Sequence, residues 1–261
     1  MKILCIGDIV GRPGREAVAH ALPRIKKEHG IDLVIANAEN ASGGSGLIPK
    51  NADEILSFGV DVMTMGDHVW DKPEIFPYLQ EHQQKIIRPA NFPDGVPGIG
   101  WAIVKASNGT KVGVINLLGR TFMRYNVSCP FRALEAIAAQ IKEKTPVIIV
   151  DMHAETTSEK VALGHFADGK VSLVFGTHTH IQTADEKILP EGTAYITDLG
   201  MSGPYDSVIG QEKTKIITRF LTSMPHKFHV AQAKGTVHGV IVKVDPKTGK
   251  AEGITRLQMG E

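Results

Sequence analysis

The chain has 261 residues, of which 42% are apolar and 22% charged, and its formal net charge is +1. This composition is that of an ordinary globular protein, long enough to bury a large core without disulfide bonds. The near-neutral charge argues against strong electrostatic binding to duplex nucleic acid or to an acidic membrane. The one or two phosphates of a small nucleotide can still be bound locally.

The cysteine content and the apolar runs indicate a cytoplasmic protein. Cys5 and Cys129 lie far apart in the sequence and do not form a disulfide framework, which favours a reducing compartment. No apolar run reaches the length of a membrane span. The first residues already follow a strand pattern and lack the basic and apolar regions of a signal peptide.

The first part of the chain alternates between strand and helix patterns. The expected elements, in chain order, are a strand Lys2–Val10, a helix Pro13–His29, a strand Ile31–Ala38, a helix Asn51–Phe58 and a strand Val60–Met65. Pro23 falls inside the first helix and is expected to kink or interrupt it. The near-continuous apolar run of the second strand is typical of a parallel sheet covered on both faces. The order β-α-β-α-β predicts an α/β fold.

Antiparallel additions follow in the middle and at the end of the chain. Asn108–Gly109 lies between two strand patterns, Trp101–Ala106 and Lys111–Leu117, which predicts a hairpin. The later expected elements are a helix Phe131–Lys144, a strand Val147–Met152, a helix Ser158–Phe166, a strand Val171–Phe175, a helix Gln211–Leu221 and strands Gly239–Val244 and Ile254–Gln258. We expect one domain over residues 1–261, with small cap insertions near 120–130 and 201–235.

Polar side chains with catalytic potential collect at the ends of the predicted strands. Ligands of a parallel α/β sheet bind outside the carboxyl ends of its strands. Five strand ends carry acids, an amide and histidines, namely Asp8, Glu39, Asn40, Asp67, His68, His153, His178 and His180. These side chains are therefore expected to converge on one edge of the sheet.

Each of these residues alone also has an ordinary structural interpretation. Asp8 and Asp67 could be helix caps or turn residues, and His153 could be a satisfied core histidine. His178 and His180 are two apart on backbone expected to be extended, so both should face the same side, and a metal is the usual reason to pair two imidazoles. Oxygen and imidazole donors without thiolate favour Mn, Fe, Zn or Co. There are too many donors for one four-coordinate ion and enough for two.

The motifs around these residues resemble a known family along nearly the whole chain. The strings GDIVGRPGR, ANAENASGG, MGDHVWD, DMHAETTSEK, GTHTHIQTADE and YITDLGMSGPYDSVIG resemble the calcineurin-like metallophosphoesterases, and among them the YmdB-like 2′,3′-cyclic-nucleotide 2′-phosphodiesterases. The resemblance implies a metallophosphoesterase-type α/β/β/α sandwich of mixed sheets with helices on the outer faces. It also implies two divalent or trivalent transition metal ions, with Fe or Mn favoured over Zn or Co, and we expect a homo-oligomer, a dimer or a tetramer.

The resemblance further assigns roles to the candidate residues. The first ion would be bound by Asp8, Glu39, Asn40 and His180, and the second by Glu39, Asp67, His153 and His178, with Glu39 bridging. His68 would be the catalytic acid, close to the phosphate but on neither ion, and a hydroxide that bridges the ions would attack phosphorus. The alternative for His68 is a structural role in which it orients Asp67.

Two positions depart from the motifs of the wider superfamily. The first motif normally reads Asp-x-His, whereas this chain has Asp8–Ile9–Val10, with valine at the position of the histidine. Asn40 is expected to supply the missing donor. The third motif is normally Gly-Asn-His, whereas this chain has Asp67 before His68. The extra negative charge predicts tighter metal binding and slower chemistry.

The substrate contacts and the reaction leave alternatives open. Arg120, Phe122 and Arg124, in the loop after the second hairpin strand, could hold a phosphate and stack on a base, as could Ser202 and Tyr205. Ordinary loop solvation and packing are the alternative for all of them. The leading function is hydrolysis of 2′,3′-cyclic and also 3′,5′-cyclic nucleotides. The alternatives are a nucleotidase or phosphomonoesterase, and a regulatory protein that responds to a nucleotide.

Overall fold

The computed structural model describes residues 1–260, whose strands form two stacked sheets, one of eight strands and one of six. The larger sheet has the order β2 (Asp8–Ile9), β12 (Met201–Pro204), β13 (Gly235–Val244), β1 (Lys2–Ile6), β3 (Leu33–Asn37), β4 (Val62–Thr64) and β5 (Ile86–Ile87), with β14 (Ala251–Gly260) paired to β13. Strands β1, β3, β4 and β5 are parallel neighbours, whereas β13 runs antiparallel to β1.

The smaller sheet is also mixed. Its order is β10 (Lys187–Ile188), β11 (Ala194–Ile196), β9 (Leu173–Thr177), β8 (Ile148–His153), β7 (Lys111–Leu118) and β6 (Trp101–Lys105). The predicted hairpin forms the antiparallel pair β6–β7, and β7, β8 and β9 are parallel. Apolar side chains of both sheets, among them Ile35 and Val240 on one and Val114 and Phe175 on the other, pack into a common core between them.

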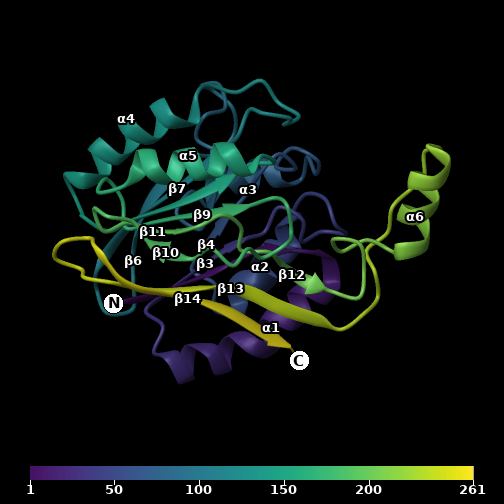
Figure 1. The fold of residues 1–261 in the computed structure, drawn as a ribbon, viewed down its shortest axis with the longest axis horizontal. Coiled ribbons are helices and arrows are strands. Elements are labelled where there is room, and N and C mark those ends of the chain that lie inside the picture. The colour runs from purple at the N-terminus through teal and green to yellow at the C-terminus, as the bar shows by residue number, and fades with distance from the viewer. Residues whose placement is uncertain (261) are drawn as a thin grey trace.

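Helices cover the outer faces of both sheets. The larger sheet is covered by α1 (Gly11–His29), α2 (Pro49–Ser57) and α3 (Ile75–Glu81), and the smaller by α4 (Pro130–Lys142) and α5 (Thr157–Ala167). Figure 1 shows α4 and α5 on one side of the molecule and α1 on the other. The predicted α/β/β/α sandwich with helices on its outer faces is therefore confirmed.

One helix stands apart from the sandwich. Helix α6 (Lys213–Thr222) lies on the segment between β12 and β13, and Figure 1 shows it projecting away from both sheets. We call residues 205–232 the arm; it falls inside the region 201–235 expected to form a cap. Several apolar side chains of the arm are exposed, namely Ile209, Ile217, Phe220, Leu221 and Met224.

The first expected strand is divided in two by Gly7. A Cβ at Gly7 would lie 1.9 Å from the carbonyl oxygen of Gly200, so only glycine lets these two backbones meet. The chain then leaves β13 and pairs through β2 with β12, and the Asp8 N–H donates to the same carbonyl. This change of partner turns Asp8 toward the edge where the other candidate ligands gather.

Pro23 does not interrupt helix α1, which is continuous from Gly11 to His29. Pro23 is exposed, and the carbonyl that loses its donor, Ala19, is only half-buried, so water can replace the missing hydrogen bond. The prediction of an interruption was wrong. No helix among residues 1–260 combines the length and the apolar content needed to cross a membrane.

Candidate metal centre

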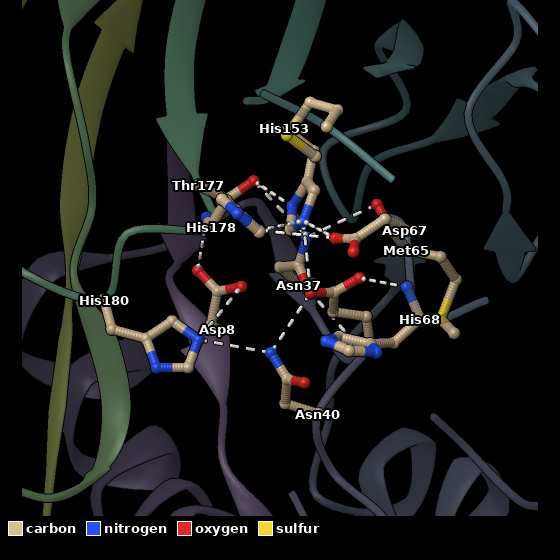
Figure 2. A network of polar contacts seen from close by, with 12 residues as sticks. Asp8, Asn37, Asn40, Met65, Asp67, His68, His153, Thr177, His178 and His180 are labelled. Carbon is tan, nitrogen blue, oxygen red and sulfur yellow. Dashed lines mark hydrogen bonds and ion pairs between the residues drawn. The ribbon is translucent and has the colours of Figure 1, made fainter. Parts of the chain in front are cut away.

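The predicted ligands come together at one edge of the two sheets. Asp8 begins β2, Glu39 and Asn40 follow β3, Asp67 follows β4 and His153 ends β8. Figure 2 shows the side chains of Asp8, Asn40, Asp67 and His153 pointing toward a common centre, with His178 and His180 entering from the segment after β9. The carboxylates of Asp8 and Glu39 and the ring of His153 have no solvent exposure, so the sandwich fixes them from all sides.

Four of these side chains form a tight donor cluster. One donor atom each from Glu39, Asp67, His153 and His178 lies within 4.8 Å of the others. His153 Nε2 is 3.1 Å from both Glu39 Oε1 and His178 Nδ1 and 3.2 Å from Asp67 Oδ1. Ligands about 2.1 Å from one transition metal ion stand roughly 3.0–3.4 Å apart. The spacing of these four donors therefore suits a single ion.

A second donor set adjoins the first through Glu39. Asn40 Nδ2 lies 3.1 Å from Glu39 Oε1 and 3.2 Å from His180 Nε2, which is 3.8 Å from Asp8 Oδ1. Asp8 Oδ1 is buried without a hydrogen-bond partner among residues 1–260. An unpaired buried carboxylate oxygen is costly, and a cation would satisfy it. Turning the Asn40 amide over would also present its oxygen to that cation.

Gly66 keeps the space between the ligands open. A Cβ at this position would lie 2.3 Å from both Glu39 Oε2 and His153 Nε2. Any side chain would therefore push the ligands of the first cluster apart. The residues present fit a metal centre in their donor chemistry, in their spacing and in this clearance.

The charges of the cluster call for a cation. Burial raises the pKa of Asp8 because its charged form has lost water. Burial also opposes the charged form of His153, but Glu39, Asp67 and Asp8 outweigh it and hold the pKa of His153 well above its usual value. The surrounding carboxylates thus favour positive charge at this point of the cluster. A metal ion bound here would take the place of a proton on His153, as is usual for imidazole ligands.

A chain of hydrogen bonds behind His153 fixes its tautomer. The buried Asp151 carboxylate accepts hydrogen bonds from Thr177 Oγ1 at 2.6 Å and from Asn37 Nδ2 at 3.2 Å. Since the hydroxyl hydrogen of Thr177 is directed to Asp151, Thr177 Oγ1 accepts from His153 Nδ1, 2.8 Å away. The proton on Nδ1 leaves Nε2 with its lone pair facing the cluster.

The segment that carries the two later histidines is not extended. His178 and His180 have φ angles of 95° and 65°, so the expectation that extended backbone places them on one side was wrong. The intervening Thr179 donates from its N–H and its hydroxyl to the buried Asp198, which also accepts from Lys160 Nζ at 2.6 Å. This buried ion pair holds the strained turn that directs both rings to the centre.

His68 lies beside the cluster and is held on one edge. Its Nδ1 is 2.8 Å from Asp71 Oδ2, and Ser45 Oγ contacts both side chains. Arg124 donates to the other oxygen of Asp71 at 2.8 Å, so Arg124 supports His68 indirectly. The backbone N–H of His68 donates to Glu39 Oε2 at 3.0 Å. The ring is thus oriented by Asp71, with Nε2 as its other proton-carrying atom.

A cavity of about 590 Å³ opens on this centre. One part of its wall is made by the candidate ligands and their neighbours: Glu39, Asn40, Gly44, His68, Glu155, His178, Thr179 and His180. The other part comes from the arm: Val208, Ile209, Gln211, Ile216, Arg219, Phe220 and Phe228. The cavity therefore joins a polar, metal-binding floor to a largely apolar wall.

The five predicted substrate contacts, Arg120, Phe122, Arg124, Ser202 and Tyr205, are not among the residues that line this cavity. Ser202 is fully buried, and its hydroxyl bonds the backbone of His238. Tyr205 stacks on the His238 ring, with centroids 4.1 Å apart. The Arg120 N–H donates to Glu159, and Phe122 is 87% exposed. Contact of these residues with a substrate stays a prediction.

Sequence reasoning did not identify several residues that shape the site. Glu155 lines the cavity, and its Oε2 lies 3.1 Å from His178 Nε2. Asp198 accepts hydrogen bonds from Thr179 and so holds the turn of residues 178–180. Glu155 follows His153 by two residues, so its proximity to a strand end was a usable pattern. The contribution of Phe220 and Phe228 had no such pattern, because it depends on how the arm is placed beside the centre.

Mixed sheets stacked in this order, with carboxylates and imidazoles at one edge, define a protein of the metallophosphoesterase type. The chain belongs to the YmdB-like family, whose model matches residues 4–257. It is 48% identical over 261 residues to the 2′,3′-cyclic-nucleotide 2′-phosphodiesterase of Bacillus subtilis (strain 168), covering 100% of this chain and 98% of that protein. The resemblance inferred from the motifs is thereby confirmed.

Solved structures show the same fold. A hypothetical protein from Thermus thermophilus superposes with a TM-score of 0.93 at 39% identity, covering all of both chains. A protein from Mycoplasma pneumoniae, described as a novel phosphatase, also gives a TM-score of 0.93, at 34% identity over 100% of this chain and 93% of the other. These likenesses extend over the sandwich and the arm together.

Proposed function

We propose that this chain is a metal-dependent phosphodiesterase that hydrolyses 2′,3′-cyclic nucleotides and also 3′,5′-cyclic nucleotides. The observation that carries the proposal is the pair of donor sets that meet at Glu39 on the floor of a nucleotide-sized cavity. The activity named for the Bacillus subtilis relative supports the same reaction class.

The centre is proposed to hold two ions. Asp8, Asn40 and His180 would bind one ion, Asp67, His153 and His178 the other, and Glu39 both. Fe or Mn is favoured, with Zn or Co as alternatives, because the donors are oxygen and imidazole without thiolate. When bound, the ions supply an activated water and neutralise the charge that grows on the phosphate oxygens.

His68 is proposed as the general acid. Asp71 holds the ring through Nδ1, so the proton that can be given to a leaving ester oxygen is the one on Nε2. The pKa of His68 supports this role: burial opposes its charged form, but Glu39, Asp67 and Asp71 outweigh it and raise the pKa. His68 lines the cavity, as a group that reaches the substrate must.

The charge of the site favours a diester over a monoester. Two divalent ions against the carboxylates of Asp8, Glu39 and Asp67 leave one net positive charge, and Glu155 adds a further carboxylate on the cavity wall. A cyclic phosphodiester carries one negative charge, whereas a phosphomonoester carries up to two at neutral pH. Since Glu155 brings the formal charge of the site to zero, the second negative charge of a monoester would gain no net attraction, and hydrolysis of a monoester, as by a nucleotidase, ranks second.

Two further assignments are part of the proposal. A homo-oligomer, a dimer or a tetramer, is supported by the exposed apolar side chains Ile217 and Met224 of the arm, which a second copy could cover. A cytoplasmic location is supported by the two free thiols, Cys5 and Cys129.

A substrate panel tests the reaction. Turnover of 2′,3′-cAMP, 3′,5′-cAMP, 3′-AMP and bis(p-nitrophenyl) phosphate is measured with added Mn²⁺ and with a chelator. We expect the diesters to be hydrolysed only with metal and the monoester to be the poorest substrate. Preference for the monoester would establish a phosphatase instead. Binding of a nucleotide without turnover of any ester would favour a regulatory protein.

A further inference from the structure

The most exposed large aromatic residue on the cavity wall is not part of the metal centre. Phe220, on helix α6, lines the cavity although 81% of its surface is accessible to solvent. An exposed phenyl ring beside a catalytic floor leaves apolar surface that a bound ligand can cover. The neighbouring Leu221 is also 81% exposed but does not line the cavity.

The arm builds an apolar wall around Phe220. Ile216, one turn earlier on α6, is 8% exposed and lines the same cavity, and Phe228 lies on the irregular segment after α6. The Arg219 guanidinium lies 5.0 Å from the centroid of the Phe228 ring, a cation–π contact that restrains both. Gln211 adds an amide to the same wall. The wall thus combines flat aromatic surface with a few hydrogen-bonding groups.

We propose that this wall, with Phe220 at its centre, is the subsite that binds the base of a cyclic nucleotide by stacking. The inference rests on the proposed function, which places the phosphate on the metal-binding floor. A cyclic nucleotide has a charged phosphate at one end and a flat aromatic base at the other. One such molecule meets the polar floor and the apolar wall of a single cavity of about 590 Å³.

The location of the subsite explains why the arm stands away from the sandwich. Its apolar face is spread over residues 208–228 and is turned toward the strand ends that carry the ligands. The base subsite is exposed and built on one helix, whereas the phosphate floor is buried and built on both sheets. Recognition of the base and chemistry at the phosphate are therefore separable by substitution.

The matched pair Phe220→Ala and Leu221→Ala tests the proposal. Both side chains are 81% exposed on the same helix, so neither truncation should unfold the protein. The KM and kcat of each variant are measured with 2′,3′-cAMP and with glycerol 1,2-cyclic phosphate, which has the same cyclic diester but no base. We expect Phe220→Ala to raise the KM for 2′,3′-cAMP by about 5- to 100-fold and to leave glycerol 1,2-cyclic phosphate unchanged. Leu221→Ala should behave as the wild type with both.

The inference is overturned if Phe220→Ala and Leu221→Ala give the same KM for 2′,3′-cAMP. It is also overturned if Phe220→Ala weakens the base-free diester equally, because the ring would then act on the phosphate end. If both variants change the oligomeric state and neither changes KM, a second copy and not a base covers the arm.

A binding measurement separates the inference from the proposed function. Equilibrium dialysis of 2′,3′-cAMP against wild type and both variants is carried out with a chelator, so that turnover is not required. Binding that is lost only in Phe220→Ala, without turnover of any ester by the wild type, would sustain the subsite and refute the phosphodiesterase. Turnover without any dependence on Phe220 would support the phosphodiesterase and refute the subsite. Neither binding nor turnover would refute both.

Discussion

The floor and the wall of the cavity are built in opposite ways. On the floor, Glu39 and His153 have no solvent exposure and lie in a hydrogen-bond network that reaches Asp151 inside the sandwich. On the wall, Phe220 and its neighbour Leu221 are 81% exposed. The floor collects side chains from strands of both sheets, whereas the wall comes from one segment between two strands.

This contrast separates what must be rigid from what only has to be complementary. Metal ligands must be held within a few tenths of an ångström of their working positions, and burial at strand ends achieves this. Stacking on a base tolerates small displacements, so an exposed helix is sufficient for it. Substitutions on the floor should therefore have larger effects than those on the wall.

The largest expected effect comes from His68→Ala. Removal of the proposed general acid should lower kcat by about 10²- to 10⁴-fold with 2′,3′-cAMP, and by less with bis(p-nitrophenyl) phosphate, whose leaving group needs no proton. Metal content, measured by elemental analysis, should be unchanged. His165→Ala, an exposed histidine on α5, is the control. Loss of metal together with activity would instead give His68 the structural role.

A smaller effect is expected from removing the hydrogen bond between Thr177 and the candidate ligand His153. Thr177→Val keeps the shape of the side chain but removes the acceptor of the His153 Nδ1 proton. Metal affinity, measured by chelator competition, should fall by about 10- to 100-fold. Thr193→Val is the matched control, since Thr193 is equally buried but bonds backbone far from the ligands. Equal metal affinities in both variants would show that the hydrogen bond from His153 to Thr177 does not position the His153 ring.

The charge of the floor is tested by Asp67→Asn. The substitution removes one negative charge from a residue whose Oδ1 lies 3.2 Å from His153 Nε2 and 3.3 Å from His178 Nδ1. We expect metal affinity to fall and kcat to rise severalfold, because the phosphate is then polarised by a more positive centre. A kcat that stays constant or falls at saturating metal would refute the charge argument.

The smallest expected effect concerns the stability of the root of the arm. Burial lowers the pKa of His238, which stacks on Tyr205, from 6.5 to about 4. Between these pH values the unfolded chain binds a proton that the folded protein does not, so the free energy of unfolding falls as the pH falls from 6.5 to 4. In the His238→Phe variant, which keeps the stack, this contribution is absent. Between pH 6.5 and 4 its free energy of unfolding should therefore fall by less than that of the wild type, with a difference of at most about 3 kcal/mol. Parallel pH profiles of urea denaturation would contradict the assignment.

Much of the floor could be predicted from the sequence, because its ligands stand in short motifs at strand ends. Gly66–Asp67–His68 and the His178–Thr179–His180 run are local patterns whose chemistry does not depend on distant packing. The same patterns did not predict the positive φ angles of the two later histidines, which arise from the buried Asp198. A motif specified which residues meet, but not how the backbone brings them together.

The wall could not be predicted in the same way. Helix α6 was expected from its apolar periodicity, but its sequence does not say which face meets the metal centre, since apolar residues occur on both sides. The short strands β5, β10, β11 and β12 were also not identified, because two to four residues carry little periodicity. The pairing of β12 with β13, which buries Ser202, was likewise not predicted.

The strand order of the larger sheet has a consequence for the synthesis of the protein. Strand β1 lies between β3 and β13, and the pair Cys5–Val240 joins two segments that are synthesised far apart in time. A nascent chain can form the pair β1–β3 early, but it completes the sheet only after β13 and β14 have been synthesised. All candidate ligands precede β13 in the sequence, but the sheet that carries Asp8 and Glu39 is incomplete without it. We therefore expect a chain that ends before β13 to bind metal poorly and to be open to proteolysis.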